Sequence, residues 1–381
     1  MVSAMKTCIY ADNAATTKLD EAALQAMLPF LREEYGNASQ PYSFSRAPKK
    51  ALAAARATIA ECIGALSEEI YFTSGGTESD NWAIKGSALT DPDHRATITS
   101  AFEHHAVLRS CSAIERLGYP VVYLQPTSDG TILPERLESI ITDNTRLVSI
   151  MYANNELGSI QPIKELCQIA HAHGALFHTD AVQAVGHVKI DVKDLGVDML
   201  SASAHKFNGP KGVGFLYLRK GVALVPHSDG GKQEHGLRAG TENIPAVVGM
   251  AVALKKNCES ISLNQLYLKT LENQLLSHLD DTGLEYTRNG SQNMLPGLIS
   301  LSFPGEDGEA ILHRMDLMGI SISTGSACDG MKNEISHVLR SVKMNRNLAK
   351  GTIRISLGKD NNQIEVDAIA EALNRILAKN K

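Results

Sequence analysis

A glycine-rich turn at residues 74–81 (SGGTESDN) follows the apolar run 70–73 and precedes a helical pattern. Two glycines and a hydroxyl at the start of a helix favour a phosphate site, because free backbone N–H groups and the helix dipole attract an anion. No Gly-Lys-Ser/Thr triplet follows these glycines in the sequence, so the turn is not a P-loop. An ordinary strand-to-helix turn with an N-cap is the more common explanation, and it stays open at this point.

A carboxylate and an amine follow two later apolar runs. Asp180 ends the apolar stretch that begins at residue 175, where a buried carboxylate needs a cationic partner. Lys206 follows another apolar run and precedes a Gly/Pro loop at residues 207–212. A single lysine of this kind is usually a surface residue. Together, however, the turn at 74–81, Asp180 and Lys206 meet the needs of pyridoxal phosphate, which are an anion site, a carboxylate for the pyridinium nitrogen and an amine for a Schiff base.

Histidine pairs and an amide pair also stand near apolar runs, but their spacing favours simpler explanations. His104 and His105 would point about 100° apart on a helix, so a capped helix start is a more common explanation than a ligand pair. The pair His171 and His173 is not expected to bind a metal either, because both side chains cannot easily point to one ion. Residues 154–156 (NNE) are either turn formers or amides that hydrogen-bond a ligand. No metal site is therefore expected.

The length and composition of the chain are those of a globular protein. At roughly 100–200 residues a domain, 381 residues correspond to two domains or to one large core with an appendage. Hydrophobic residues make up 43% and charged residues 21%, close to the average of soluble proteins. The net charge of −5 gives no reason to expect nucleic acid as a ligand. No membrane span is expected either, because the sequence contains no sufficiently long apolar run.

The first residues and the cysteines favour a cytoplasmic protein. The N-terminus (MVSAMK) has a lysine without an apolar stretch behind it, so no secretory signal is predicted. The six cysteines lie far apart and form no C-x-x-C pair in the sequence, which disfavours a zinc or redox motif. A chain of this size can build its core without disulfides, so reduced thiols in a cytoplasm are the simplest expectation.

Short apolar runs that alternate with helical patterns must position these residues. The apolar runs lie at residues 70–74, 96–99, 121–124, 147–152 and 175–178, and helical patterns lie at 46–66, 77–89 and 163–173. Such alternation predicts a mostly parallel sheet that is covered by helices on both faces. Ligands then bind outside the carboxyl ends of the strands, where the residues named above stand. The first helical pattern should stop near Gly64.

The pattern changes after about residue 244. A long helical stretch at 247–279 leads to a β-type run at 298–303 and a helix at 306–318. A second β-type run at 352–357 and a helix at 364–378 follow. The sequence therefore predicts an α/β chain with a second, smaller α+β domain joined by the long helix.

Segments spread over nearly the whole chain, taken together and in order, resemble those of one enzyme family. They are 10–17 (YADNAATT), 73–81 (TSGGTESDN), 103–104 (EH), 154–158 (NNELG), 180–183 (DAVQ), 203–206 (SAHK), 238–243 (RAGTEN), 325–328 (GSAC) and 353–358 (IRISLG). The chain resembles the class V aminotransferases, a branch of the fold-type I pyridoxal-phosphate enzymes, and within them the cysteine desulfurases of the NifS/IscS type. Each segment alone is a weak indication; GSAC discriminates best.

The resemblance implies a fold-type I α/β transferase with a large and a small domain. Residues 16–260 would form the large domain, which binds pyridoxal 5′-phosphate (PLP) and contains the mostly parallel sheet. Residues 261–381 would form the small α+β C-terminal domain, with residues 1–15 packing alongside it. The small domain would carry the catalytic-cysteine loop at 323–333.

The resemblance also implies a role for each matching residue. Lys206 resembles the Schiff-base lysine, His104 the catalytic histidine stacked on the cofactor ring, and Asp180 the partner of the pyridine nitrogen. The other implied cofactor contacts are Gln183 for the ring oxygen, Gly76, Thr77, Ser203 and His205 for the phosphate, and Thr241 for the phosphate of a neighbouring subunit. Asn155 and Arg354 would hold the substrate carboxylate, which suits the fork of an arginine.

The implied activity is the PLP-dependent removal of sulfur from L-cysteine. Lys206 would take the Cα proton, and the Cys328 thiolate would attack the substrate sulfur, leaving a persulfide on the enzyme and releasing alanine. The small and polar residues of 323–333 suit a mobile loop that delivers the persulfide to an acceptor. A buried packing role is the commonest fate of a free cysteine, but a polar loop is the wrong place for it. The other five cysteines, which stand in apolar or helical stretches, are expected to be structural.

The implied partners are L-cysteine, a second copy of the chain, and a sulfur-acceptor protein such as an iron–sulfur scaffold, whose cluster the persulfide could contact. The acceptor stays open, because iron–sulfur assembly, tRNA thiolation and DNA phosphorothioation all begin with the same persulfide. The alternatives are a selenocysteine lyase, an aminotransferase of the same family, or a non-catalytic adaptor of the same fold. Cys328 speaks against an aminotransferase, and Lys206, Asp180 and His104 speak against an adaptor.

Three positions depart from the pattern usual in this family. Lys232 replaces a glycine, His235 stands where arginine is common, and Asp329 follows Cys328 in place of a small hydroxyl residue. The Asp329 carboxylate should raise the pKa of the neighbouring thiol. The departures bear on the identity of the acceptor more than on the chemistry.

Overall fold

The computed structural model describes residues 8–324 and 335–378 of the chain. The predicted nucleophile Cys328, its neighbour Asp329 and most of the loop 323–333 lie outside the described residues. Within the described ranges, no helix combines the length and the apolar character that a membrane span requires.

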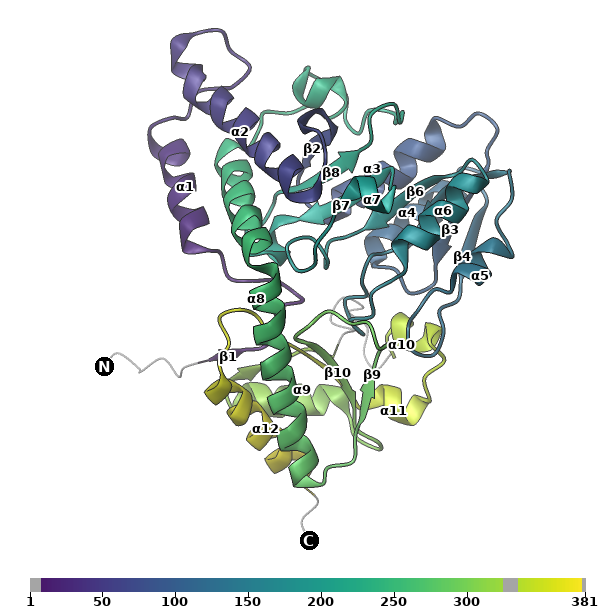
Figure 1. Cartoon of the computed structure of the whole chain (residues 1–381), viewed down its shortest axis with the longest axis vertical. Helices are drawn as coiled ribbons and strands as arrows, with labels where there is room; N and C mark the ends of the chain where they lie inside the picture. The colour runs from purple at the N-terminus through teal and green to yellow at the C-terminus, as the bar shows by residue number, and fades with distance from the viewer. Residues whose placement is uncertain (1–7, 325–334, 379–381) are drawn as a thin grey trace.

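A seven-stranded sheet forms the centre of the large lobe, at the top of Figure 1. Its strands, in spatial order, are β2 (Ile70–Thr73), β8 (Gly214–Leu218), β7 (Met199–Ser203), β6 (Leu176–Asp180), β5 (Thr145–Ser149), β3 (Ala96–Ser100) and β4 (Val121–Leu124). The pairings from β7 across to β4 are parallel, whereas β8 runs antiparallel to both β7 and β2. The predicted mostly parallel sheet is therefore confirmed, with β8 as an antiparallel addition.

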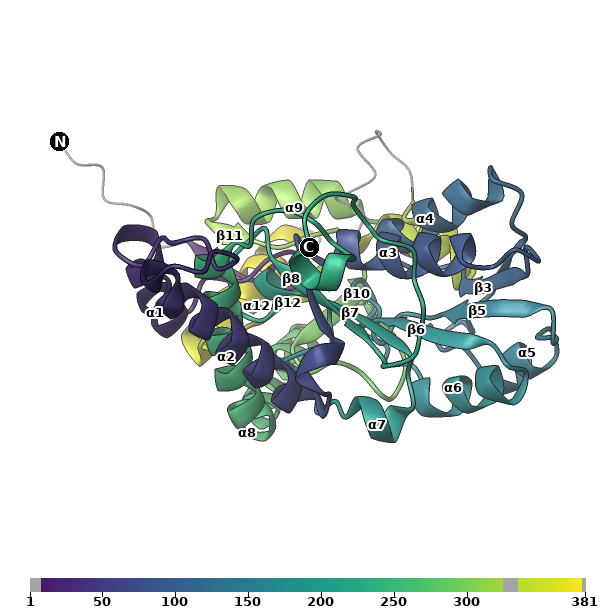
Figure 2. The same ribbon diagram turned by 90° about the horizontal axis from the view of Figure 1, so that it is seen from above.

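Helices cover both faces of this sheet, as the alternation in the sequence predicted (Figure 2). One face carries α3 (Gly76–Leu89) and α4 (His105–Glu115), and the other carries α2 (Arg46–Ile63), α5 (Pro134–Glu138), α6 (Ile163–Ala172) and α7 (Val192–Leu195). In β5, Leu147 belongs to the apolar cluster that includes residues of α3 and α4, while Val148 belongs to the cluster that includes residues of α2 and α6. Successive side chains of a strand point to opposite faces of the sheet, so β5 presents apolar side chains to both faces.

Helix ends follow local sequence signals. α2 stops after Ile63 because Gly64 adopts a left-handed φ of 74°, which glycine accommodates without strain, so the predicted stop near Gly64 is confirmed. The long helix α8 (Ile244–Thr282) begins after Asn243, whose side chain accepts a first-turn N–H at 3.2 Å. α8 passes from one lobe to the other (Figure 1) and contains the predicted helical stretch 247–279.

The small lobe is built on a second sheet and a second apolar core. Three antiparallel strands form the sheet, in the order β12 (Thr352–Ser356), β10 (Leu298–Ser302) and β9 (Thr287–Asn289). The end of α8, α9 (Gly308–Leu317) and α12 (Gln363–Leu377) pack around its core, and β1 (Ile9–Tyr10) pairs in parallel with β11 (Ile320–Ser321) in this lobe. The division at residues 260 and 261 falls inside α8 and stays a prediction.

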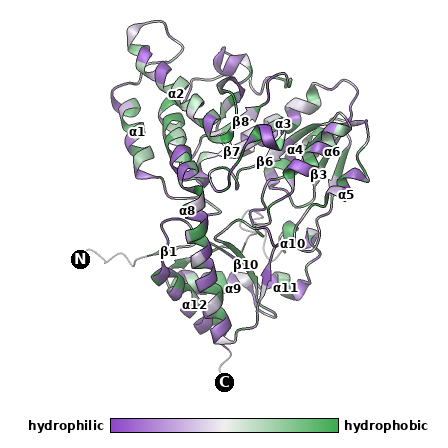
Figure 3. Cartoon of the chain, viewed as in Figure 1, coloured by the Kyte–Doolittle hydropathy of each residue, from purple (hydrophilic) through white to green (hydrophobic). Residues whose placement is uncertain are grey.

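Surface helices bury one stripe only. In Figure 3 the strands of the large sheet are mostly hydrophobic, whereas α12 alternates between hydrophilic and hydrophobic residues. Ile369, Leu373 and Leu377 recur at every fourth position of α12 and are buried, so this stripe faces the small core. The remaining helical segments are α1 (Glu21–Arg32), α10 (His337–Ser341), α11 (Arg346–Lys350), η1 (Ser43–Ser45), η2 (Ser67–Glu69), η3 (Ala204–Lys206) and η4 (Gln233–Gly236).

Candidate functional site

A cavity of about 310 Å³ lies at the carboxyl ends of the parallel strands, where an open α/β sheet is expected to bind its ligand. The predicted site residues that line it are Gly76, Thr77, His104, Asn155, Asp180, Gln183, Ser203, His205, Lys206 and Arg354. Thr241 is exposed and is not among the lining residues, and Cys328 lies outside the described part of the chain. The structure therefore brings together ten residues that the sequence places up to 278 positions apart, from Gly76 to Arg354.

The turn before α3 forms a narrow part of this cavity. α3 begins at Gly76, and a Cβ there would lie 2.5 Å from Cγ2 of Val182, so only glycine lets the helix start approach the turn after β6. The same Cβ would lie 3.7 Å from Cβ of Ser203, which places the Ser203 hydroxyl beside the helix start. First-turn N–H groups lack intrahelical partners, so together with the hydroxyls of Ser203 and Thr77 they suit a phosphate.

The two histidines of the cavity, His104 and His205, are held neutral mainly by burial. Burial and then the cations Lys206 and Lys211 lower the pKa of His205 to about 4. Burial also lowers the pKa of His104, although Asp180 opposes that shift. His104 is the N-cap of α4, and its Nδ1 accepts a backbone N–H at 3.2 Å, so the neutral ring carries its proton on Nε2. A neutral ring fixed by this cap can stack on an aromatic ligand.

Two carboxyl groups line the cavity close to His104. Asp180 ends β6 and is 6% exposed, and Asp80 lies on α3 and is 1% exposed. One oxygen of each lies within 4.8 Å of the other and of a His104 ring nitrogen. This spacing alone would also suit a metal ion, but the adjoining phosphate cradle and the lysine favour a larger organic group with a cationic nitrogen.

Lys206 ends η3 and is tied to the N-terminal segment. Its Nζ donates hydrogen bonds to the carbonyl oxygens of Ala14, at 2.5 Å, and Ala15, at 2.9 Å. Gln183 donates from Nε2 to the same Ala14 oxygen at 2.9 Å. The amine of Lys206 and the amide of Gln183 thus share one backbone acceptor, and both can donate to a bound ligand instead.

Arg354 comes from the small sheet and reaches the cavity from the opposite lobe. Its guanidinium donates to the Asp12 carboxylate at 2.7 Å and to the carbonyl oxygen of Asn155 at 2.8 Å. The Nε atom is buried and has no hydrogen-bond partner among the described residues. A fixed guanidinium with a spare N–H is suited to bind a carboxylate.

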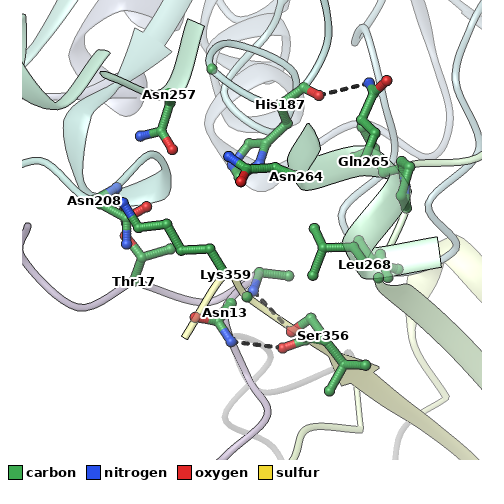
Figure 4. Close-up of a pocket in the computed structure, with 18 of the residues that line it drawn as sticks. Asn13, Thr17, His187, Asn208, Asn257, Asn264, Gln265, Leu268, Ser356 and Lys359 are labelled. Carbon is green, nitrogen blue, oxygen red and sulfur yellow. Dashed lines mark hydrogen bonds between the residues drawn. The ribbon is translucent and has the colours of Figure 1, made fainter. Parts of the chain in front are cut away.

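A second pocket of about 70 Å³ adjoins the first, and Ala14 and Gln183 line both. Figure 4 shows the Gln265 side chain of α8 pointing to the backbone of His187, where its Nε2 donates to the carbonyl oxygen at 2.9 Å. The His187 Nε2 lies 2.8 Å from the carbonyl oxygen of Lys206. This pocket is far smaller than typical cofactor sites, so the larger cavity is the candidate site.

Asp12 and Asp80 were not predicted as site residues. They stand inside the segments 10–17 and 73–81, but residue types alone gave them no role. The sequence did contain one indication that Asp80 belongs to the site. Asp80 stands one helical turn after Gly76, so the two residues lie on the same face of α3. Of the positions that depart from the family pattern, Lys232 and His235 are exposed.

Comparison with known proteins relates the chain to one family over most of its length. It matches the aminotransferase class-V family over residues 9–369. It is 43% identical over 379 residues to a Methanosarcina thermophila protein named cysteine desulfurase IscS, covering 99% of this chain and 94% of the relative. A solved NifS-like protein aligns with a TM-score of 0.92 at 38% identity, over 97% of this chain and 99% of that chain. A structure described as SspA in complex with cysteine aligns with a TM-score of 0.82 at 36% identity, over 92% and 99%.

The fold is that of fold-type I PLP-dependent enzymes. Within that class, the chain belongs to the class V aminotransferase family. The predicted family, fold class and PLP cofactor are confirmed by this membership. The residues of the cavity fit PLP, because the glycine-lined helix start, the buried carboxylate and the lysine supply its three requirements.

Proposed function

We propose that this chain is a PLP-dependent cysteine desulfurase, which removes sulfur from L-cysteine, releases L-alanine and carries the sulfur as a persulfide on Cys328. The observation that carries the proposal is the lining of one cavity by Lys206, Asp180, His104 and Arg354. The relative named cysteine desulfurase supports the reaction, and the related structure described as a complex with cysteine supports the substrate.

The cavity residues divide into those that hold the ring and those that hold the phosphate. When bound, PLP supplies an electron sink that stabilises negative charge at Cα of an attached amino acid. In our proposal Asp180 pairs with the pyridine nitrogen, His104 stacks on the ring and Gln183 donates to the ring oxygen. The phosphate contacts in the same proposal are Gly76, Thr77, Ser203 and His205.

Lys206 acts as the base in this proposal. The carbonyl oxygens of Ala14 and Ala15 orient its Nζ in the cavity. With His104 and His205 neutral, the deprotonated amine of Lys206 is the strongest base among the described lining residues. It can therefore take the proton from Cα of cysteine.

Transfer of sulfur requires a nucleophile, and we assign this role to Cys328. Its thiolate attacks the substrate sulfur and forms an S–S bond, while the bond between that sulfur and Cβ breaks. The electron pair of the broken bond stays on the carbon side, where Cβ gains a proton and alanine results. Asp329 beside Cys328 disfavours the thiolate through like charge, so the wild-type reaction should need a somewhat higher pH than with a neutral neighbour.

Arg354 and Asn155 hold the substrate carboxylate in this proposal. Arg354→Ala should raise the KM for cysteine by roughly 30-fold or more, because a desolvated charge-assisted contact contributes about 2–4 kcal/mol. The PLP content should stay close to that of the wild type. Steady-state kinetics and the absorbance of bound PLP measure the two effects.

Arg288→Ala is the matched control for this variant. Arg288 pairs with Glu272 in the same lobe and does not line the cavity, so its loss reports on the stability of the small lobe alone. An unchanged KM in Arg354→Ala, or an equal increase in Arg288→Ala, would mean that the carboxylate is held elsewhere.

We further propose a cytoplasmic homodimer that passes its sulfur to an acceptor protein, such as an iron–sulfur scaffold. The exposure of Thr241 outside the cavity of its own chain supports a contact with the phosphate in a neighbouring subunit. All five cysteines in the described part of the chain are free thiols, which agrees with a reducing compartment.

Purified protein tests the proposed function directly. It should be yellow, lose the colour with borohydride, and form alanine from L-cysteine together with an equal amount of sulfide when a thiol reductant is present. Turnover of selenocysteine with none of cysteine would support a selenocysteine lyase instead, and transfer of the amino group without alanine would support an aminotransferase.

A further inference from the structure

Asp80 is a buried carboxyl group to which the proposed function gives no role. It lines the cavity beside Asp180 and is 1% exposed. Aspartate is almost never buried to this extent without a partner, yet Oδ1 of Asp80 has no hydrogen-bond partner among the described residues. A carboxyl group in such a place needs either a neighbouring cation or a proton of its own.

The nearest basic side chain to Asp80 supplies no charge. His178 of β6 lies with Nε2 3.7 Å from Oδ1 of Asp80, but burial lowers the pKa of His178 to about 3. Its two ring nitrogens lie 2.9 Å from the Ser149 hydroxyl of β5 and 3.0 Å from the Ser201 hydroxyl of β7. The Ser201 hydroxyl also favours the charged form of Asp80 and so opposes the rise in its pKa. These partners are polar but uncharged, so they do not neutralise a carboxylate.

The charged groups around Asp80 favour ionisation of Asp180 instead. Burial raises the pKa of Asp180 as well, but Asp180 accepts a backbone N–H at 2.9 Å, and this hydrogen bond and the Lys206 cation oppose that shift. The pKa of Asp80 is raised by burial first and then by the negative charges of Asp180 and Glu103. Glu103 is itself buried between β3 and α4, and burial raises its pKa to about 8. Acids crowded into a buried site cannot all be ionised, and Asp80 has the least support for a charge.

We propose that Asp80 is a positioning residue, a neutral carboxylic acid that donates a hydrogen bond to Asp180 and so keeps Asp180 as the carboxylate for the pyridine nitrogen of PLP. This inference rests on the proposed cofactor site. One proton on the pair leaves one negative charge to face one cationic ring nitrogen, which balances charge in the buried site. The two carboxyl groups, now within 4.8 Å, must come to hydrogen-bond distance when the site is loaded.

Unfolding of the full chain without cofactor tests whether Asp80 is neutral. An acid that stays protonated in the folded protein but ionises in the unfolded chain makes stability fall as pH rises above about 4. Asp80→Asn removes this effect. The urea midpoint of the variant relative to the wild type should therefore increase between pH 5 and pH 8, whereas a constant difference over this range would show that Asp80 is ionised in the folded protein and would overturn the proposal.

Binding of PLP tests whether Asp80 positions Asp180. Asp80→Asn keeps a neutral hydrogen-bond donor, so its PLP dissociation constant should stay within about threefold of the wild type, whereas Asp80→Ala should weaken binding by roughly tenfold or more. The pH midpoint of the bound cofactor's absorbance should likewise move in Asp80→Ala and in Asp180→Asn but not in Asp80→Asn. Equal effects of the Asn and Ala variants, or none in Asp80→Ala, would overturn the proposal.

The control is Asp194→Asn, which neutralises an exposed aspartate paired with Lys164 at 2.6 Å and should leave both measurements unchanged. If the wild type binds no PLP, the proposed function fails, and the unfolding comparison still decides whether Asp80 is neutral. If Asp80→Ala does not fold, the two Asn variants still test the proposal. Asp180→Asn removes the negative charge that the proposal places on Asp180, whereas Asp80→Asn leaves that charge in place.

Discussion

Lys206→Ala should give a folded protein that turns over cysteine at least about a thousandfold more slowly than the wild type. The amine has two roles in the proposed reaction, because it holds the cofactor covalently and takes the Cα proton. The variant should also lose the lysine-linked absorbance of bound PLP. Its fold should survive, since the lost contacts are hydrogen bonds to Ala14 and Ala15, worth about 1–3 kcal/mol together.

Alanine production and the visible spectrum measure these two losses. Lys193→Ala is the matched control, because Lys193 is an exposed lysine of α7 that does not line the cavity. Its activity and spectrum should equal those of the wild type. More than a trace of alanine from Lys206→Ala would refute the assignment of Lys206, whereas an unfolded variant would show that its contacts to Ala14 and Ala15 matter for the fold.

The large sheet could be predicted because its strands are local patterns. Runs such as 147–152 and 175–178 are short and apolar, and the helices between them dictate parallel pairing, which β5 and β6 show. β8 was not predicted, since GFLYL is buried throughout and has no alternation that marks a strand direction. Its antiparallel direction comes from its pairing with β7, which lies just before it in the sequence, and with β2, which lies far away in the sequence.

Part of the site could be predicted for the same reason. Asp180 and Lys206 follow adjacent segments of one sheet, so the rule that ligands bind at the carboxyl ends of parallel strands brings them together. Arg354 and Asp12 are different, because they are 342 residues apart and meet through the small lobe. No periodicity in the sequence encodes that contact, and Arg354 was found only through the resemblance of its segment.

Asp80 shows a second limit of reasoning from residue types. On the sequence it is one acid in a helical stretch that also contains Glu78, and acids on helices are usually exposed. In the structure Glu78 is paired with Arg238, whereas Asp80 points to the buried side beside Asp180. Which of two acids two positions apart is buried depends on how α3 packs on the sheet, a long-range property that residue types do not specify.

Cys328→Ser should separate the chemistry at the cofactor from the transfer of sulfur. Serine keeps the size and polarity of the side chain but replaces a thiol that ionises near neutral pH by a hydroxyl that does not. The variant should therefore bind PLP, stay yellow and still change its absorbance when cysteine is added. Formation of persulfide and sulfide should fall at least about a thousandfold, because no group accepts the substrate sulfur.

Cys8→Ser is the matched control, since Cys8 is an exposed thiol whose Sγ lies 3.5 Å from the Ser321 hydroxyl, outside the cavity. It should transfer sulfur at the wild-type rate. If Cys328→Ser forms alanine and sulfide near the wild-type rate, the thiol is not the acceptor, and the enzyme expels sulfur or selenium without covalent transfer, as a lyase would. If the variant loses its colour, Cys328 supports the cofactor site itself. A yellow variant that binds cysteine but transfers no sulfur is the outcome that the proposed mechanism requires, because only then are the cofactor and the thiol two separable parts of one reaction.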